Sequence, residues 1–123
     1  MDKKDKKILL VDDAAFMRML IRDTLTKNGY TNICEAADGE IACQMFESES
    51  PELVVMDITM PNKTGIEALA EIKGKNPSAK VIMCSAMGQE AMVVEAIKLG
   101  ALDFIVKPFK PDRILQTVEK ILG

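Results

Sequence analysis

The sequence predicts one α/β domain, built on a parallel sheet that carries helices on both faces. Short apolar runs alternate with longer amphipathic segments along the chain, which is the order that strand–helix–strand units produce. The runs at residues 8–11, 53–56 and 81–84 are almost continuously apolar, as expected of strands covered on both faces. The length of 123 residues fits a single domain. We expect that domain to fill residues 1–123, with no output domain.

Five strand–helix pairs are predicted, with strands at residues 8–11, 33–34, 53–56, 81–84 and 104–106. The last helix is the clearest, because its apolar residues recur at helical spacing: Ile114, Leu115, Val118, Ile121 and Leu122. Pro111 and Asp112 suit its first turn, where a missing N–H costs nothing and a negative charge is favourable. Asn28-Gly29 and Leu99-Gly100 are typical of helix C-termini.

Composition excludes several classes of function. With 16 basic and 19 acidic residues the net charge is −3, which argues against nucleic acid as the main ligand. The sequence contains no histidine, so a Ser-His-Asp triad and a His-ligated zinc are both excluded. Cys34, Cys43 and Cys84 lack a CxxC spacing and are expected to be free, buried thiols. No apolar run approaches the roughly 20 residues that span a bilayer, and we expect a cytoplasmic protein that does not bind membranes.

Polar groups stand at the predicted strand ends. Asp12 and Asp13 end the first strand, Asp57 the third, Ser85 the fourth and Lys107 the fifth. The carboxyl ends of parallel strands form one edge of a sheet, so these groups should lie together. The second strand ends at residues 35–37 without a comparable group.

Three neighbouring carboxylates repel one another unless a proton or a cation shares them. All are hard oxygen ligands, which favours Mg²⁺ as the cation, with Mn²⁺ as a substitute. Taken singly, each group has a plainer interpretation: one acid of the pair, or Ser85, could cap the next helix, and Lys107 could simply be exposed. Their arrival at one edge of one predicted sheet favours a site.

These residues resemble response-regulator receiver domains, and above all the stand-alone receivers of bacterial chemotaxis. The matching segments are ILLVDDAAFMR at 8–18, VVMDITMPNKTG at 54–65, VIMCSAMG at 81–88 and ALDFIVKPF at 101–109. The resemblance covers essentially the whole chain. It implies a flavodoxin-like, doubly wound (βα)5 fold with strand order 2-1-3-4-5. It also makes the Lys107–Pro108 bond a candidate cis peptide.

The resemblance implies a role for each matching residue. Asp57 would be the phosphoacceptor, and Lys107 would pair with the phosphoryl oxygens. Asp13, Asp57 and the backbone carbonyl of Thr59 would coordinate Mg²⁺, with Asp12 acting mostly through water. Thr59, Ala86 (through its backbone N–H) and Lys107 would contact the phosphoryl group, together with the hydroxyl of Ser85.

Further positions of the same family pattern bear on how the protein would switch and on how long the acyl phosphate would last. Phe104 occupies the aromatic switch position and would change its burial in step with Ser85. Thr59 and Met87 stand where receivers tune attack of water on the acyl phosphate, and neither side chain carries an acid or amide to orient that water. We therefore expect slow to moderate self-dephosphorylation.

The resemblance also implies partners. A chemotaxis histidine kinase would supply the phosphoryl group, and the flagellar motor switch protein would bind the face formed by residues 89–98, 104–106 and 112–120. The expected form is a monomer without catalytic activity beyond its own phosphorylation and dephosphorylation, on which a dedicated phosphatase could act. On that face Met87, Met92 and Phe104 could give adaptable apolar contact, while core filling is the plainer interpretation of the methionines.

Three alternatives remain open at the level of sequence. A receiver in a phosphorelay, or one with a non-motor target, would look the same. A flavodoxin-like electron carrier would need its cofactor phosphate beside Asp12 and Asp13, which would repel it, and the 4% aromatic content without Trp offers little to stack on a flavin. A phosphatase with an aspartyl nucleophile would want a second acid where Thr59 stands.

Overall fold

The structure is a computed structural model and describes residues 2–123. Within these residues a short 3-10 turn (Lys3–Asp5) precedes five strand–helix units. The strands are β1 (Ile8–Val11), β2 (Ile33–Ala36), β3 (Leu53–Asp57), β4 (Val81–Ala86) and β5 (Asp103–Lys107). The helices are α1 (Ala15–Lys27), α2 (Gly39–Glu49), α3 (Gly65–Lys75), α4 (Glu90–Lys98) and α5 (Pro111–Leu122).

The strands form one parallel sheet in the order β2-β1-β3-β4-β5. This confirms the predicted fold class and strand order. From β1 the chain crosses to β2, and from β3 it crosses the other way to β4. The connections therefore diverge above the carboxyl ends of β1 and β3, where open α/β sheets bind their ligands.

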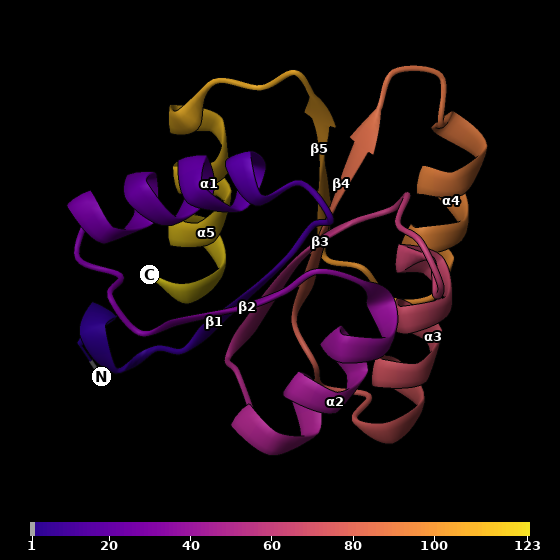
Figure 1. The fold of residues 1–123 in the computed structure, drawn as a ribbon, viewed down its shortest axis with the longest axis horizontal. Coiled ribbons are helices and arrows are strands. Elements are labelled where there is room, and N and C mark those ends of the chain that lie inside the picture. The colour runs from indigo at the N-terminus through magenta and orange to yellow at the C-terminus, as the bar shows by residue number, and fades with distance from the viewer. Residues whose placement is uncertain (1) are drawn as a thin grey trace.

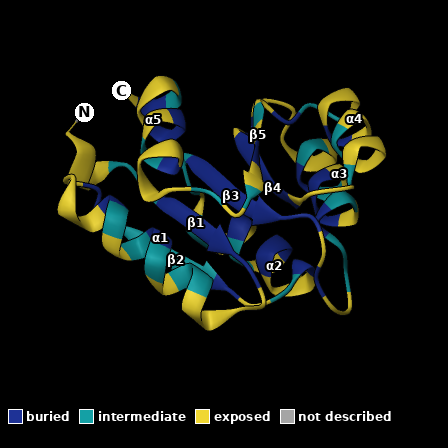
Figure 2. Cartoon of the chain, turned by 90° about the horizontal axis from the view of Figure 1, so that it is seen from above, coloured by how far each residue is buried: buried dark blue, intermediate teal, exposed yellow. Residues whose placement is uncertain are grey.

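Helices cover the sheet in two layers. Figure 1 shows α1 and α5 on one face and α2, α3 and α4 on the other, and the view from above in Figure 2 shows the buried strands between them. Buried side chains gather accordingly in two clusters within residues 2–123, one beneath each helical layer.

The pleat of each strand assigns its residues to these layers alternately. In β3, Val54 and Met56 pack toward α2–α4, whereas Leu53 and Val55 pack toward α1 and α5. Continuing the alternation puts Asp57 on the α1/α5 side. By the same argument Asp12 and Lys107 fall on the α1/α5 side, while Ser85 and Phe104 fall on the α4 side.

The strands β3, β4 and β5 run past the apolar runs that predicted them. Asp57, Ser85 and Lys107 lie among their last residues, as expected of groups that end these strands, whereas the acidic pair follows β1 instead of ending it. Each of the three strand-end groups thereby has a partner in the parallel ladder. In the parallel ladder Asp57 stands opposite Cys84 and Ser85 stands opposite Val106.

The predicted helix ends are confirmed. Asn28 and Leu99 are the C-caps of α1 and α4, and the following Gly29 and Gly100 adopt φ of 97° and 108°, the left-handed region that glycine occupies without strain. Pro111 begins α5. The Lys107–Pro108 peptide bond is cis, as the resemblance implied.

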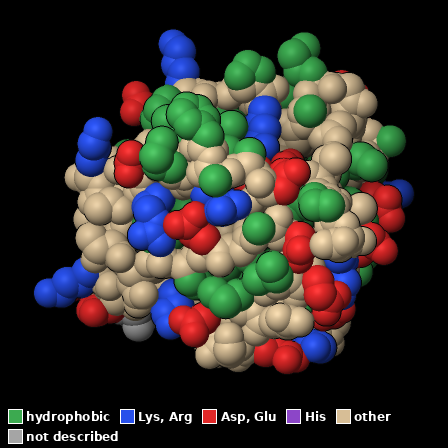
Figure 3. Space-filling model, viewed as in Figure 1, with side chains coloured by type: hydrophobic (Ala, Val, Ile, Leu, Met, Phe, Trp, Pro, Cys, Tyr) green, Lys and Arg blue, Asp and Glu red, His purple; other side chains and the backbone are tan. Residues whose placement is uncertain are grey.

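The surface carries charges of both signs. On the face shown in Figure 3 acidic and basic side chains are interspersed, with hydrophobic groups between them, in line with the small net charge of −3. Among the helices of residues 2–123, none combines the length and apolar character that a bilayer crossing requires.

Candidate functional site

Three carboxylates converge above the carboxyl ends of β1 and β3. Oxygen atoms of Asp12, Asp13 and Asp57 lie within 4.8 Å of one another. Asp12 and Asp57 are 3% and 8% exposed, whereas Asp13 is exposed to solvent. The sequence-based prediction that the acidic pair meets the acid of the third strand is confirmed.

Lys107 reaches this cluster from β5, over the end of β4. Its Nζ lies 2.8 Å from Oδ2 of Asp12 and 3.2 Å from Oδ2 of Asp57. The side chain of Lys107 is about four-fifths buried, so the plainer interpretation of an exposed lysine is wrong. One ammonium group thus pairs with two buried acids, one just after β1 and one at the end of β3.

Burial and the lysine act in opposite directions on Asp57. Removal from water raises the pKa of the Asp57 carboxyl, and the negative charge of Asp12 adds to this, while Lys107 opposes both; the pKa remains raised. Burial alone would lower the pKa of Lys107, but its bonds and charge interactions with Asp12 and Asp57 raise it. Lys107 is therefore a permanent positive charge beside Asp57 at neutral pH.

Asp12 is engaged on both carboxylate oxygens. Its Oδ1 accepts a hydrogen bond from the Ala14 N–H at 2.9 Å, and its Oδ2 accepts from Lys107 at 2.8 Å. The N-cap residue of α1 is Ala14, so neither acid of the pair is the N-cap residue of the helix. Asp12 therefore has less capacity for a direct metal bond than Asp13 or Asp57.

A network absent from the sequence-based prediction fixes the loop after β1. Arg18 donates to the backbone carbonyl of Asp12 at 2.5 Å and to Glu35 at 2.8 Å, and Arg22 pairs with the other oxygen of Glu35 at 2.7 Å. Glu35, at the end of β2, thus serves to anchor α1. The helical spacing of Arg18 and Arg22 on one face was the available signal, but it does not reveal their common partner.

Ser85 places a hydroxyl group near the end of β4. Ser85 is 1% exposed, and its Oγ has no hydrogen-bond partner among residues 2–123. The N-cap of α4 is Gln89, so the interpretation of Ser85 as a helix cap is wrong. A buried hydroxyl without a partner is costly, and a group arriving from the Asp57 side could satisfy it.

Gln89 is a further residue that the sequence did not indicate. Its Oε1 accepts from the Ala86 N–H at 2.6 Å, and its Nε2 donates to Oγ1 of Thr59 at 2.6 Å. Thr59 is exposed in the loop that follows Asp57. The structure thus brings Thr59 and Ala86 to the rim of the acidic cluster, joined by a third side chain.

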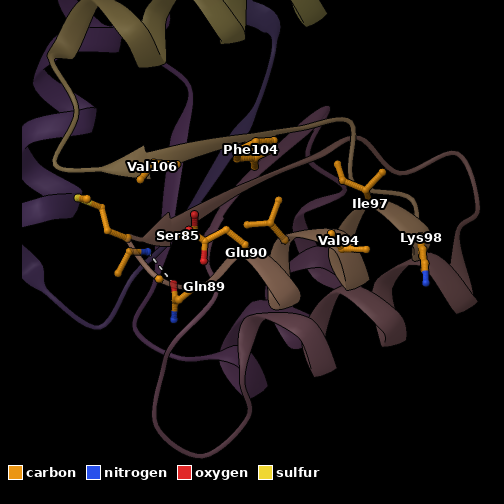
Figure 4. A pocket seen from close by; sticks show the side chains of 12 residues that line it. Ser85, Gln89, Glu90, Val94, Ile97, Lys98, Phe104 and Val106 are labelled. Atoms are coloured by element: carbon orange, nitrogen blue, oxygen red, sulfur yellow. Dashed lines mark hydrogen bonds between the residues drawn. The ribbon is translucent and has the colours of Figure 1, made fainter.

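An apolar groove extends from Ser85 along the adjoining face. It has a volume of about 670 Å³ and lies between α4 and strands β4 and β5 (Figure 4). Its lining includes Met87, Val94, Ile97, Phe104 and Val106. Phe104 is 37% exposed and Met87 79% exposed. The core-filling interpretation of Met87 and Met92 is wrong, because both side chains are exposed.

The three cysteines do not take part in the site. Within the described residues all three are free, with Cys43 and Cys84 buried and Cys34 half-buried. Burial raises the pKa of both Cys43 and Cys84 to about 12. Their thiolate forms are scarce at neutral pH, which leaves them unreactive.

The site combines a buried carboxylate, a lysine and two more acids with a buried, unpartnered hydroxyl on the neighbouring strand. The family model described as response regulator receiver domain matches residues 8–119. The chain belongs to the response regulator receiver domain family. These domains act in two-component systems with a histidine kinase as partner, and they bind Mg²⁺ at an acidic pocket.

Known relatives point to chemotaxis. The chain is 56% identical to the chemotaxis protein CheY of Bacillus subtilis over 117 residues, covering 95% of this chain and 98% of that protein. It is 53% identical to the chemotaxis protein CheY of Thermotoga maritima over 116 residues, covering 94% and 97%. Among solved structures, the receiver domain of NtrX from Brucella abortus superposes with a TM-score of 0.88 at 37% identity, covering 94% of this chain and 97% of that one.

Proposed function

We propose that this protein is a phospho-accepting switch that takes a phosphoryl group on Asp57 from a histidine kinase and then binds a partner protein. The observation that carries the proposal is the pairing of buried Asp57 with Lys107 at 3.2 Å, inside the cluster that Asp12 and Asp13 complete. Of the three acids, Asp57 is the one that is buried and lies on the central strand of the sheet. Asp12 is hydrogen-bonded on both carboxylate oxygens, and Asp13 is exposed to solvent.

In the proposed transfer an oxygen of Asp57 attacks the phosphorus of the kinase phosphohistidine. The P–N bond breaks as the new P–O bond forms, which leaves an acyl phosphate on Asp57 and returns the electron pair to the imidazole. Phosphoryl transfer depends on positioning and on neutralising the charge of the equatorial oxygens. The ammonium of Lys107 is already placed to do this and requires little reorganisation.

The acidic cluster fits a resident magnesium ion. Its donors are hard oxygens, and the free capacity on Asp13 and Asp57 suits an ion that takes one or two carboxylates and keeps its waters. We assign the ligands to Asp13, Asp57 and the backbone carbonyl of Thr59, with Asp12 acting mostly through water. When bound, Mg²⁺ would supply positive charge to the phosphoryl oxygens.

The new phosphoryl group carries about −1.5 to −2 charges. The unpartnered hydroxyl of Ser85 would donate to it, as would the backbone N–H groups of Thr59 and Ala86. As Ser85 moves inward, the half-exposed ring of Phe104 can fill the space on the α4 side. The switch is then a two-state equilibrium that phosphorylation biases.

For the output we propose docking to the flagellar motor switch protein through residues 89–98, 104–106 and 112–120. Identity to two CheY proteins supports this, as does the exposure of Met92, Val94, Ile97, Phe104 and Val106 on that face. The protein would act in the cytoplasm as a monomer, without a catalytic role beyond its own phosphorylation and dephosphorylation. A phosphorylation-dependent increase in affinity for a recombinant motor switch protein tests the output. Binding of other targets alone would favour a phosphorelay or a non-motor role.

Intact-mass spectrometry tests the phosphoacceptor. With acetyl phosphate and Mg²⁺ the wild type gains one phosphoryl group, and Asp57→Asn gains none. The exposed Asp23 of α1 offers a matched control, since Asp23→Asn should be labelled like the wild type. Chelation of the metal with EDTA should abolish labelling. Equal labelling of Asp57→Asn and the wild type would refute the assignment.

A further inference from the structure

Gln89 connects the two loops that border the acidic cluster. Its carbonyl oxygen accepts from the backbone N–H of Ala86, and its amide nitrogen donates to the hydroxyl of Thr59, both at 2.6 Å. Figure 4 shows Gln89 below Ser85, with its bond to the β4 terminus as a dashed line. Thr59 follows Asp57 by two positions, and Ala86 is the last residue of β4. One carboxamide therefore ties the loop after β3 to the loop after β4.

The same carboxamide occupies a donor that the phosphorylated state requires. The N–H of Ala86 carries one hydrogen, so it cannot donate fully both to Gln89 and to a phosphoryl oxygen on Asp57. Ser85, immediately before Ala86, is buried without a partner. The hydroxyl of Ser85 therefore has no acceptor, whereas the N–H of Ala86 already donates to Gln89.

We propose that Gln89 is a positioning residue that latches the resting state by competing with the phosphoryl group for the Ala86 N–H. The proposal rests on the function assigned to Asp57. When the phosphoryl group takes the Ala86 N–H, the carbonyl of Gln89 is displaced and the bridge to Thr59 loses its second anchor. The latch therefore opposes phosphorylation in the resting protein and is released by it.

Loss of the Gln89 hydrogen bonds would affect the proposed docking face, because Gln89 stands at the start of α4. Gln89 is the N-cap residue of α4, and Ala96 is the buried residue of that helix. Within the described residues of α4, only Val93 joins Ala96 in packing against the core, so few side chains anchor this helix. Gly88, just before Gln89, has φ of 89°, and apart from its two chain neighbours no atom of the described residues lies within 4 Å of the position its Cβ would take. Freeing Gln89 lets this loop and the first turn of α4 move, which reshapes the groove lined by Val94 and Phe104.

The direction of the effect distinguishes a latch from a support. Both bonds of Gln89 are exposed, so their net contribution lies at the low end for hydrogen bonds, and removing them should shift the equilibrium about two- to fivefold toward the phosphorylated form. A residue that merely supports the fold would weaken the resting and the phosphorylated states alike.

Beryllofluoride, a tetrahedral anion that stands in for the phosphoryl group on a carboxylate, provides the test. Calorimetric titration with beryllofluoride and Mg²⁺ should show about two- to fivefold tighter binding for Gln89→Ala than for the wild type. Urea unfolding of the ligand-free Gln89→Ala protein should show a lower midpoint than the wild type. Gln44, exposed on α2, is the matched control, and Gln44→Ala should leave the beryllofluoride affinity unchanged.

A double-mutant cycle isolates the bridge. Thr59→Val removes the hydroxyl that accepts from Gln89 but keeps the backbone groups of Thr59. Adding this substitution to Gln89→Ala should therefore change the beryllofluoride affinity less than it does in the wild type. Fully additive effects would show that the bond between Gln89 and Thr59 has no energetic role and would overturn its part in the latch.

The outcomes separate the two proposals. If the wild type binds beryllofluoride and Asp57→Asn does not, the function stands, and equal or weaker binding by Gln89→Ala then overturns the latch alone. If wild type and Asp57→Asn behave alike, the assignment of Asp57 fails, and the latch fails with it.

Discussion

Replacing Gly65 with alanine should disturb the backbone that carries Asp57. Gly65 is the first residue of α3, and its N–H donates to the carbonyl of Ile58 at 2.7 Å. A Cβ on Gly65 would lie 2.1 Å from the backbone oxygen of Asp57 and 2.8 Å from Cα of Ile58. Both distances are far inside van der Waals contact, and backbone atoms cannot rotate away. The substitution must therefore displace either the start of α3 or the end of β3.

The magnitude follows from the size of this overlap. Adding a methyl group to a tightly packed site costs about 1–3 kcal/mol, and alanine recovers about 0.5–1 kcal/mol because glycine is the more flexible residue in the unfolded chain. We expect Gly65→Ala to lower the free energy of unfolding by about 1–2 kcal/mol. The rate of phosphorylation should fall as well, because the displaced carbonyl belongs to Asp57.

The same helix supplies a control of opposite sign. Apart from its chain neighbours and the backbone of its own helix, no atom of the described residues lies within 4 Å of a Cβ built on Gly74, which also belongs to α3. Gly74→Ala should therefore raise the free energy of unfolding by about 0.5–1 kcal/mol and leave phosphorylation unchanged. Urea unfolding followed by circular dichroism measures both variants. If Gly65→Ala were as stable as Gly74→Ala and equally phosphorylated, the close contact between α3 and Asp57 would be refuted.

Three further predictions concern other groups. Lys107→Met should increase the thermal stabilisation that Mg²⁺ gives, because Asp12 and Asp57 lose their resident cation. The variant should be phosphorylated more slowly and should lose phosphorylation-dependent partner binding, and an unchanged Mg²⁺ shift in melting temperature would contradict this. In the native protein a maleimide should label half-buried Cys34 first, since the pKa of Cys43 and of Cys84 is raised to about 12 by burial; equal labelling of the three thiols would be the opposing result. Burial would raise the pKa of Glu35, but bonds from two arginines lower it below its ordinary value of 4.5. The ionised Glu35 therefore stabilises the fold above about pH 4.5, and this contribution is lost as the pH falls through the lowered pKa. Glu35→Gln should be less stable than the wild type at neutral pH and equally stable in acid. Urea unfolding midpoints at several pH values measure this.

The fold was predictable because its signals are local. Alternating apolar runs, Gly29 and Gly100 after helix ends and Pro111 at a helix start each report on a few neighbouring residues, and all were confirmed. The apolar runs alone stop short of the strand ends, because Asp57 and Lys107 interrupt the hydrophobic pattern although ladder pairing extends through them, as expected of residues that end a strand. Hydrophobic pattern alone does not show where pairing stops.

The site was predictable where topology decides it. Parallel strands that deliver Asp12, Asp57 and Lys107 at one edge bring them together whatever the side chains between them. Contacts that depend on side-chain reach across loops were missed. Gln89 meets Thr59 from thirty positions away, and no local pattern pairs them.

The central claim is that, of three acids within 4.8 Å of one another, Asp57 receives the phosphoryl group. Sodium borohydride reduces an acyl phosphate to an alcohol, so it converts a phosphorylated aspartate to homoserine. After phosphorylation, reduction and digestion, peptide mass spectrometry should find homoserine at position 57. Homoserine at position 12 or 13 instead, with Asp57 intact, would contradict the account.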